Sequence, residues 1–251
     1  MGELLRIATD PQLYDNVTVN WEKEGRGLNS PNRRHYWSYL QPFARAWQNK
    51  RILDIGAGTG WLLDVLVREI GVQSAIGIDP SVRNIVLAGK LYPSISMIRT
   101  TLQGFAPKEQ FDVALSVLSL LHIHPLEAAY EKVSQLLAPK GIFMAVVPDY
   151  DYFRTPRKGR VPQIEDLGPD ECVTMIPREY GTVADIVRRT SFYEEVAKEH
   201  GLILTHHTPM LAAQEDRSQY SELSPMIVTH LLRFENICCE SDKLVKKIDQ
   251  R

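Results

Sequence analysis

The stretch that most constrains this chain of 251 residues is residues 51–62, which read RILDIGAGTGWL. Its first half is a short apolar run that suits a buried strand, and glycine then occupies every second position, at Gly56, Gly58 and Gly60. Apolar residues recur at helical spacing after the loop, and Gly71 stands where a helix would end. Strand, glycine turn and helix form the first half of a nucleotide-binding βαβ unit, because glycines let the backbone approach a ligand and the helix N-terminus offers unpaired N–H groups.

The kind of nucleotide follows from the residues around the glycines. In the dinucleotide loop G-x-G-x-x-G/A the third small residue lets helix and strand pack beside a pyrophosphate, but here that position is Trp61. An acid two places before the first glycine, Asp54, is also foreign to that loop. The next predicted strand, residues 74–79, ends in Asp79, where a ribose-binding carboxylate belongs. Either motif alone would also fit an ordinary tight βα turn, and the two in register indicate a nucleoside site.

The sequence D-x-G-x-G-x-G at residues 54–60 resembles motif I of the class I S-adenosylmethionine-dependent methyltransferases, and Asp79-Pro80 looks like their motif II. The resemblance implies a loop that faces a sulfonium and an amino acid rather than phosphates. A carboxylate beside such a ligand is favourable because the ligand carries positive charge. The resemblance implies S-adenosyl-L-methionine as cofactor and S-adenosyl-L-homocysteine as product. The cofactor-binding residues expected from these two motifs are Asp54, Gly56, Ala57, Gly58, Gly60, Asp79 and Pro80.

Later strands supply further candidates at the same sheet edge, because open α/β sheets bind ligands at the carboxyl ends of their strands. Thr101 and Leu102 follow the third predicted strand and are candidates for contacting adenine, although the usual acid of that motif is absent. The fourth strand ends in Ser116 and Val117, which the resemblance places beneath the cofactor.

His122 is the candidate catalytic residue. The run LSLLHI that contains it resembles the motif IV region, where many small-molecule methyltransferases of this group place a histidine. An imidazole titrates near neutral pH and can serve as general base toward a phenol or hydroxyl, whereas the alternative is a histidine that packs at a strand–helix junction. His124 follows two residues later, but two such ligands without a third make a poor metal site, so we predict no bound metal.

An arginine is expected at the carboxylate of the cofactor. Residues 20–40, NWEKEGRGLNSPNRRHYWSYL, are similar to the segment before motif I in ubiquinone-pathway O-methyltransferases, and this resemblance implies such an arginine. Arg33 and Arg34 both lie near that position, and Arg34 is the residue we name.

The rest of the chain repeats the βα pattern, which predicts an α/β fold with a doubly wound, mostly parallel sheet. The class I resemblance implies seven strands with the last one, residues 226–234, antiparallel. On the preceding strand, 202–208, His206 and His207 should point to opposite faces and so form no ligand pair. We expect an N-terminal cap over residues 1–48 and a methyltransferase domain over 49–251.

Residues 149–185 break the pattern and are predicted to be a long loop that serves as a substrate lid. This segment contains a basic cluster at Arg154, Arg157, Lys158 and Arg160.

Composition narrows the range of functions that the chain can have. A net charge of −2 argues against a protein held to nucleic acid by bulk electrostatics. The three cysteines fit no metal or redox spacing, and no apolar run reaches the ~18 residues that span a bilayer, so we expect a cytoplasmic protein. The preferred function is methyl transfer to an O, N or C atom of a small molecule in biosynthesis. A tRNA- or protein-modifying methyltransferase and a silent cofactor-binding module are alternatives, and a dinucleotide oxidoreductase comes last. The sequence names neither the acceptor nor an oligomer interface.

Overall fold

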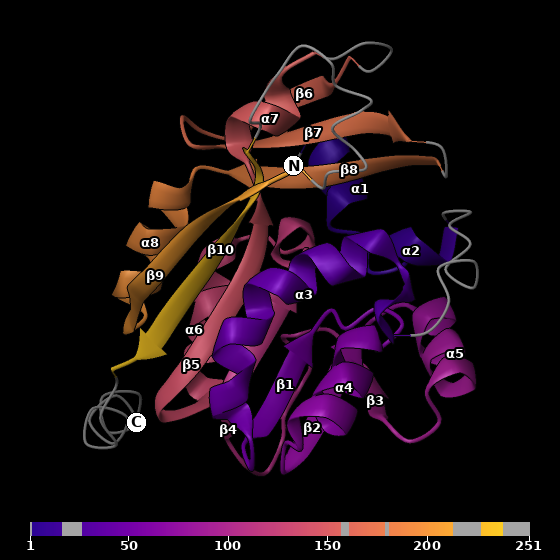
Figure 1. The fold of residues 1–251 in the computed structure, drawn as a ribbon. Coiled ribbons are helices and arrows are strands. Elements are labelled where there is room, and N and C mark those ends of the chain that lie inside the picture. Colours follow the sequence, from indigo (N-terminus) through magenta and orange to yellow (C-terminus); the bar gives the residue numbers. More distant parts are fainter. Residues whose placement is uncertain (1, 17–26, 157–160, 179–180, 213–226, 238–251) are drawn as a thin grey trace.

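The computed structural model of the chain describes residues 2–16, 27–156, 161–178, 181–212 and 227–237 (Figure 1). A seven-stranded sheet with the order β3-β2-β1-β4-β5-β10-β9 forms its centre. Strand β10 runs antiparallel to both of its neighbours, while the other described pairs in this sheet are parallel, so the predicted fold class is confirmed. The strands of this sheet are β1 Arg51–Ile55, β2 Ser74–Asp79, β3 Ser96–Arg99, β4 Phe111–Val117, β5 Leu137–Pro148, β9 Leu202–Leu211 and β10 Ile227–Asn236.

Helices cover both faces of the sheet (Figure 1). On one face of the sheet, α3 and α4 pack over a core that contains Trp47 and Ile52. On the other face, α6 and α8 enclose Tyr130 and Phe143. Burying each such large apolar side chain stabilises the fold by about 1.5–3 kcal/mol. None of the helices in the described part of the chain is long and apolar enough to cross a membrane. The helices are α1 Glu3–Ala8, α2 Leu13–Asn16, α3 Pro31–Ala44, α4 Trp61–Val65, α5 Val82–Leu91, α6 Leu126–Leu136, α7 Tyr150–Arg154 and α8 Thr190–Glu199, with the short turns η1 Gly27–Asn29, η2 Arg45–Trp47, η3 Leu66–Ile70 and η4 Leu120–His122.

Two helices contain a glycine or a proline that commonly ends or interrupts a helix. The helix after the glycine loop begins at Trp61, changes to π geometry over η3, and ends at Gly71, whose φ of 71° is the left-handed conformation expected of a terminating glycine. Pro42 lies inside α3, which continues to Ala44 before η2 begins. The helix therefore continues for two residues beyond the proline.

Residues 149–185 are not the long loop that we predicted. They contain α7 and most of a three-stranded antiparallel sheet made of β6 Gln163–Asp166, β7 Glu171–Arg178 and β8 Gly181–Arg188. Prolines, glycines and charges at the start of the segment hid two runs of β-forming residues, of which Val173 and Ile186 are fully buried. Helix α1 packs against this small sheet, which lies at the end of the molecule toward which β5 runs (Figure 1).

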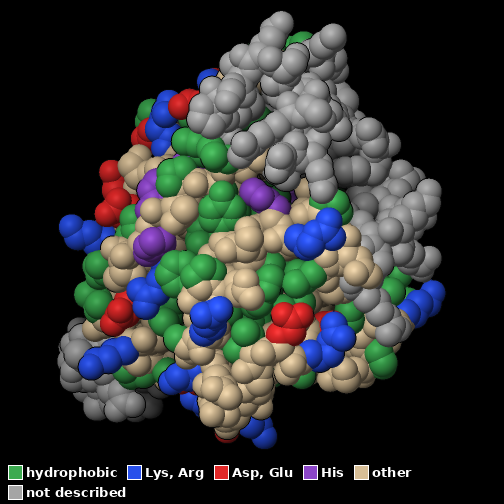
Figure 2. Space-filling model, viewed as in Figure 1, with side chains coloured by type: hydrophobic (Ala, Val, Ile, Leu, Met, Phe, Trp, Pro, Cys, Tyr) green, Lys and Arg blue, Asp and Glu red, His purple; other side chains and the backbone are tan. Residues whose placement is uncertain are grey.

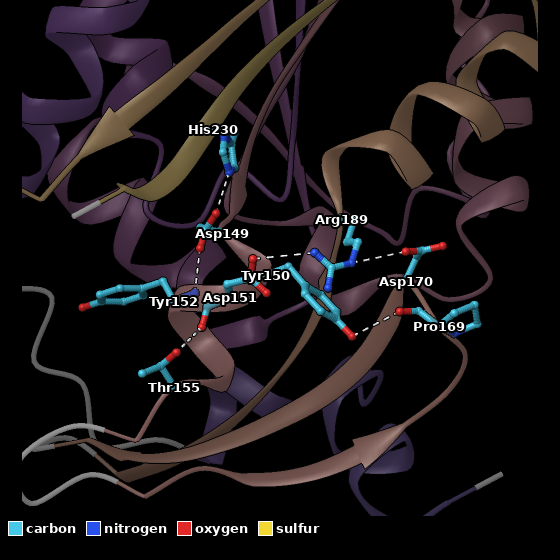
Figure 3. A network of polar contacts seen from close by, with 9 residues as sticks. All are labelled: Asp149, Tyr150, Asp151, Tyr152, Thr155, Pro169, Asp170, Arg189 and His230. Atoms are coloured by element: carbon cyan, nitrogen blue, oxygen red, sulfur yellow. Dashed lines mark hydrogen bonds and ion pairs between the residues drawn. The ribbon is translucent and has the colours of Figure 1, made fainter. Parts of the chain in front are cut away.

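The base of this insertion is fastened to the main sheet by the polar network of Figure 3. Asp149 directly follows β5, and its carboxylate accepts a hydrogen bond from the backbone N–H of Tyr152 at 2.6 Å and lies 2.8 Å from Nε2 of His230 on β10. Arg189 pairs with Asp170 at 3.3 Å and with Asp151 at 3.6 Å. Asp149 thus joins the start of the insertion to β10, whereas the ion pairs of Arg189 are exposed and connect it to acids of the insertion itself.

Candidate active site

The glycine loop between β1 and α4 contains glycines with two different functions. Gly56, Gly58 and Gly60 have φ values of 66°, 56° and 80°, which other residues rarely adopt. A Cβ atom at Gly56 would lie 2.3 Å from Cβ of Ser119, and one at Gly60 would lie 2.2 Å from Cδ1 of Ile95, so close packing requires both glycines. A Cβ atom at Gly58 would meet no atom within 4 Å. Gly58 therefore borders open space beside the loop, where a ligand can approach the backbone.

Asp79 lies at the tip of β2 and holds the loop in place. One carboxylate oxygen, Oδ2, accepts a hydrogen bond from the N–H of Gly58 at 2.9 Å. The other, Oδ1, accepts from the N–H of Ser81 at 2.9 Å and from Nδ2 of Asn84 at 3.2 Å. Burial raises the pKa of Asp79, and these hydrogen bonds counteract part of that increase. The buried Oδ1 of Asn84 has no hydrogen-bond partner among the described residues, which leaves an acceptor at this edge of the sheet.

Asp54, on β1, is a second buried acid beside the loop. Its exposed fraction is 3%, and burial, followed by the negative charge of Asp79, raises its pKa to about 8. Two carboxyl groups of like charge at the carboxyl edge of neighbouring strands favour a ligand that carries positive charge. Asp54 is the acid, two residues before the first glycine, that distinguishes this loop from a dinucleotide-binding loop.

Of the two candidate arginines, the structure brings Arg33 rather than Arg34 to the glycine loop. Arg33 is buried, and its Nη2 donates to Oγ1 of Thr59 within the loop at 3.4 Å. Arg34 is exposed and donates to the backbone carbonyls of Leu28 and Asn29, at 3.0 and 2.8 Å. Successive residues of a helix point about 100° apart, so only one of the two can face the loop. The structure thus places Arg33, and not the predicted Arg34, beside the glycine loop; residues 20–26 of the same segment lie outside the described residues.

The residues predicted for the adenine side occupy different environments. The backbone N–H of Thr100 bonds to the carbonyl of Asp79 at 3.2 Å, which brings Thr101 and half-buried Pro80 to one edge. Thr101 is exposed, and its hydroxyl accepts from the N–H of Gly104 at 3.2 Å. The side chain of Leu102 instead packs in the core and is 3% exposed, so that only its backbone can contact a ligand.

The loop after β4 is tied to the glycine loop. Ser116 is fully buried, and its hydroxyl lies 2.5 Å from that of Ser119, which in turn donates to the carbonyl of Ile55 at 2.5 Å. Val117 is half-buried at the end of β4. Ala57 is buried, and its N–H bonds to the carbonyl of Ile78 at 3.0 Å. The predicted residues of the first, second and fourth strands are therefore brought together.

His122 ends the turn η4, and its Nδ1 lies 3.1 Å from the carbonyl oxygen of Ala8, at the end of α1. Because a carbonyl can only accept, this geometry assigns the hydrogen to Nδ1 and places the lone pair of the neutral ring on Nε2. The contact joins residues 114 positions apart, and no pattern in the sequence signals it. It suits both a packed histidine and a general base of fixed tautomer.

His206 and His207 on β9 follow the predicted strand alternation. The ring of His206 packs on Phe43 of α3 with centroids 5.1 Å apart, while His207 bonds to His230 on the other face at 2.9 Å. The sequence did not reveal this second contact, because it depends on the pairing of β9 with β10.

The described residues contain no group of three or more His, Cys, Asp or Glu side chains arranged to hold a metal ion. Cys172 is a buried free thiol, and Cys238 and Cys239 lie outside the described residues.

The sheet order, the glycine loop and the acid at the tip of β2 together define a class I methyltransferase fold. A profile of the methyltransferase domain family matches residues 31–207, and the chain belongs to this family.

A curated relative, the ubiquinone biosynthesis O-methyltransferase of Rhodopseudomonas palustris (strain BisB5), is 35% identical over 98 residues. That match covers 38% of this chain and 38% of the relative, so the chain spans less than half the length of this relative. The structure is also similar to an S-adenosylmethionine dependent methyltransferase from Mesorhizobium loti, with a TM-score of 0.59 and 21% identity over 78% of this chain and 97% of that one. An S-adenosylmethionine-dependent methyltransferase from Clostridium acetobutylicum ATCC 824 gives a TM-score of 0.60 and 15% identity over 80% and 89%. These two likenesses show the fold.

Proposed function

We propose that the chain transfers a methyl group from S-adenosyl-L-methionine to a hydroxyl oxygen of a small molecule. One observation carries the proposal: two buried acids, Asp54 and Asp79, flank a glycine loop whose middle glycine borders open space. S-adenosylmethionine carries a sulfonium, an ammonium and two ribose hydroxyls. Its positive charges match the excess of carboxylates, and its hydroxyls match the acceptors.

The individual groups of the site fit the parts of this cofactor. Asp79 and the unpartnered Oδ1 of Asn84 can accept from the ribose hydroxyls, and Asp54 would face the amino acid portion. Arg33, held against Thr59, would meet the carboxylate of the cofactor. Pro80 and Thr101 border the adenine side of the same edge. A pyrophosphate, in contrast, would disfavour ionisation of both acids and would be repelled by either of them in its ionised form.

The bound cofactor supplies an activated methyl group, so the protein needs chiefly to align the acceptor and to exclude water. An acceptor hydroxyl must lose a proton as its oxygen gains the methyl group. His122 would take that proton on Nε2, because its Nδ1 is bonded to the carbonyl of Ala8. The products are S-adenosyl-L-homocysteine, the methyl ether and a proton. The relatives named ubiquinone biosynthesis O-methyltransferases support oxygen as the methylated atom.

The insertion formed by α7 and β6–β8, together with α1, would act as the lid over the acceptor. It lies at the carboxyl end of the main sheet, and β8 packs against η4, which contains His122. Of the predicted basic cluster, Arg154 already pairs with Asp166 at 2.7 Å, while Arg157, Lys158 and Arg160 lie outside the described residues. The division into an N-terminal cap over 1–48 and a methyltransferase domain over 49–251 belongs to this proposal.

No observation favours a polymer substrate. On the face drawn in Figure 2, basic and acidic side chains are interspersed with hydrophobic ones over the described surface, and an extended basic surface of the kind that holds nucleic acid is not seen there. The net charge of the chain is −2. Salt-dependent binding of tRNA would argue for the alternative.

The test is a methyl-transfer assay with deuterated S-adenosylmethionine and a panel of phenols, catechols and hydroquinones, with primary amines as comparison. Mass spectrometry should detect S-adenosylhomocysteine together with a labelled methyl ether, and His122→Ala should abolish most of the product. Methyl groups found only on nitrogen or carbon, or no product from any acceptor despite bound cofactor, would contradict the proposal.

A further inference from the structure

A fully buried arginine lies next to the loop that contains His122. Arg188, the last residue of β8, is 0% exposed. Its Nη1 donates to the carbonyl of Leu120 at 3.1 Å and its Nη2 to the carbonyl of Ile123 at 2.8 Å. Its Nε donates to Oε1 of Glu171, on β7, at 2.5 Å. One guanidinium thus connects the inserted sheet to the backbone on both sides of His122.

The opposite side of this loop is fastened to the cofactor edge. Ser119 donates to the carbonyl of Ile55 at the end of β1, and the backbone N–H of His122 bonds to the carbonyl of Ser119 at 3.1 Å. The loop is therefore held between the glycine-loop strand and the guanidinium of Arg188. A planar guanidinium can bond to both flanking carbonyls at fixed geometry, whereas an ammonium acts as a single point of attachment.

The charges of this pair need an explanation other than stability. Removing an arginine and a carboxylate from water costs several kcal/mol each, and well-packed apolar residues of similar volume commonly stabilise a fold as well or better. Glu171 is also 3.6 Å from His124, so the pair contacts the segment after η4 as well. The side chain of the adjacent Arg189, in contrast, is 44% exposed, and it forms ion pairs with Asp151 and Asp170 and a cation–π contact with the ring of Tyr150.

We propose that Arg188, held by Glu171, is a positioning residue that places the imidazole of His122 for proton transfer. The inserted sheet then belongs to the catalytic apparatus and is more than a cover. This inference deepens the proposed function and rests on it, because it takes His122 as the general base.

The test compares Glu171→Gln/Arg188→Met with Arg189→Met. The double variant removes both buried charges at nearly constant volume, and the control removes an arginine from the neighbouring exposed position. For the double variant, kcat should fall about 10²-fold, because displacement of a catalytic group by about 1 Å has this effect. The affinity for S-adenosylhomocysteine should stay within about twofold of the wild type, since Arg188 does not touch the glycine loop. Arg189→Met should leave kcat unchanged.

Two further measurements are independent of turnover. Nitrogen-15 NMR of the imidazoles, with His122 assigned by its own variant, should report hydrogen on Nδ1 in the wild type and a tautomer mixture in the double variant. Hydrogen exchange at the amides of His122 and Ile123 should accelerate in the double variant alone. These readouts distinguish the two ideas: a wild type that binds cofactor but methylates nothing refutes the proposed function, while the NMR and exchange data still decide whether Arg188 positions His122.

A double variant that folds, keeps the wild-type kcat and keeps the Nδ1 tautomer would overturn the inference, provided that His122→Ala is inactive. If the double variant does not fold, Arg188→Lys decides the matter. This variant retains the charge and one attachment, and its kcat should lie about tenfold below the wild type. Full activity of Arg188→Lys would overturn the inference.

Discussion

The buried carboxyl group of Asp54 makes cofactor binding depend on pH. In the free protein, burial and the charge of Asp79 raise the pKa of Asp54 to about 8. A bound ligand with a cationic amino acid portion favours the ionised form and lowers that pKa. Binding below pH 8 must then be accompanied by release of a proton, and the affinity must decrease as the pH falls.

The magnitude follows from the protonated fraction. If Asp54 is ionised in the complex throughout the range, the apparent dissociation constant scales as 1 + 10^(pKa − pH), where the pKa is that of the free protein. It then rises about 50-fold between pH 8 and pH 6, which corresponds to about 2 kcal/mol at room temperature. S-adenosylhomocysteine is suited to this titration because it keeps the amino acid and cannot react.

Isothermal titration calorimetry in buffers of different ionisation enthalpy measures both the affinity and the number of protons released. Asp54→Asn should abolish the pH dependence, and 5′-methylthioadenosine, which lacks the amino acid, should show little of it with the wild-type protein. Equal pH slopes for the wild type and Asp54→Asn would refute the reasoning, because the proton would then come from another group.

Four further predictions concern the same site. Asp79→Ala should weaken binding of S-adenosylhomocysteine by about 2–4 kcal/mol in calorimetry through loss of charge-assisted hydrogen bonds, and unchanged affinity would exclude that role. His122→Ala should lower kcat by about 10²–10⁴-fold while the cofactor affinity stays nearly the same, and surviving activity would make the histidine structural. Gly56→Ala should lower the melting temperature because its Cβ would clash with Ser119, whereas Gly58→Ala should chiefly impair cofactor binding; the reverse pattern would contradict the assignment of open space to Gly58. Because the folded-state pKa of Asp54 is raised above its usual 3.8, the stability that this group contributes is present below about pH 4 and is lost as the pH rises toward 8, so the free energy of unfolding of Asp54→Asn should lack this loss in urea titrations.

The sequence predicted the fold well wherever local patterns and the main sheet agree. The span of β2, residues 74–79, was predicted to the residue, and the helix after the glycine loop ends at Gly71 as expected. The insertion was mistaken for a loop because its opening prolines and charges obscured the apolar runs of β7 and β8, which pair with each other and, through β7, with β6 rather than with the main sheet. Periodicity within a single strand cannot reveal such pairing.

The residues of the candidate site could be predicted where they belong to one motif in the sequence. The residues of the glycine loop and Asp79 come from adjacent elements, and their register follows from parallel pairing of β1 with β2. Arg33 and Arg34 could not be distinguished without the orientation of α3 relative to the loop. The contacts of His122 with Ala8 and of its loop with Arg188 join segments far apart in the chain, and they arise from packing of the insertion and α1 on the main domain.

Whether the glycine loop binds a methyl donor can be measured by titrating the full chain with S-adenosylhomocysteine, with Asp79→Ala as site control. One molecule should bind per chain, Asp79→Ala should bind it markedly more weakly, and NAD or NADP should not compete. Absence of binding at any concentration, or binding of a dinucleotide at this loop, would contradict this expectation.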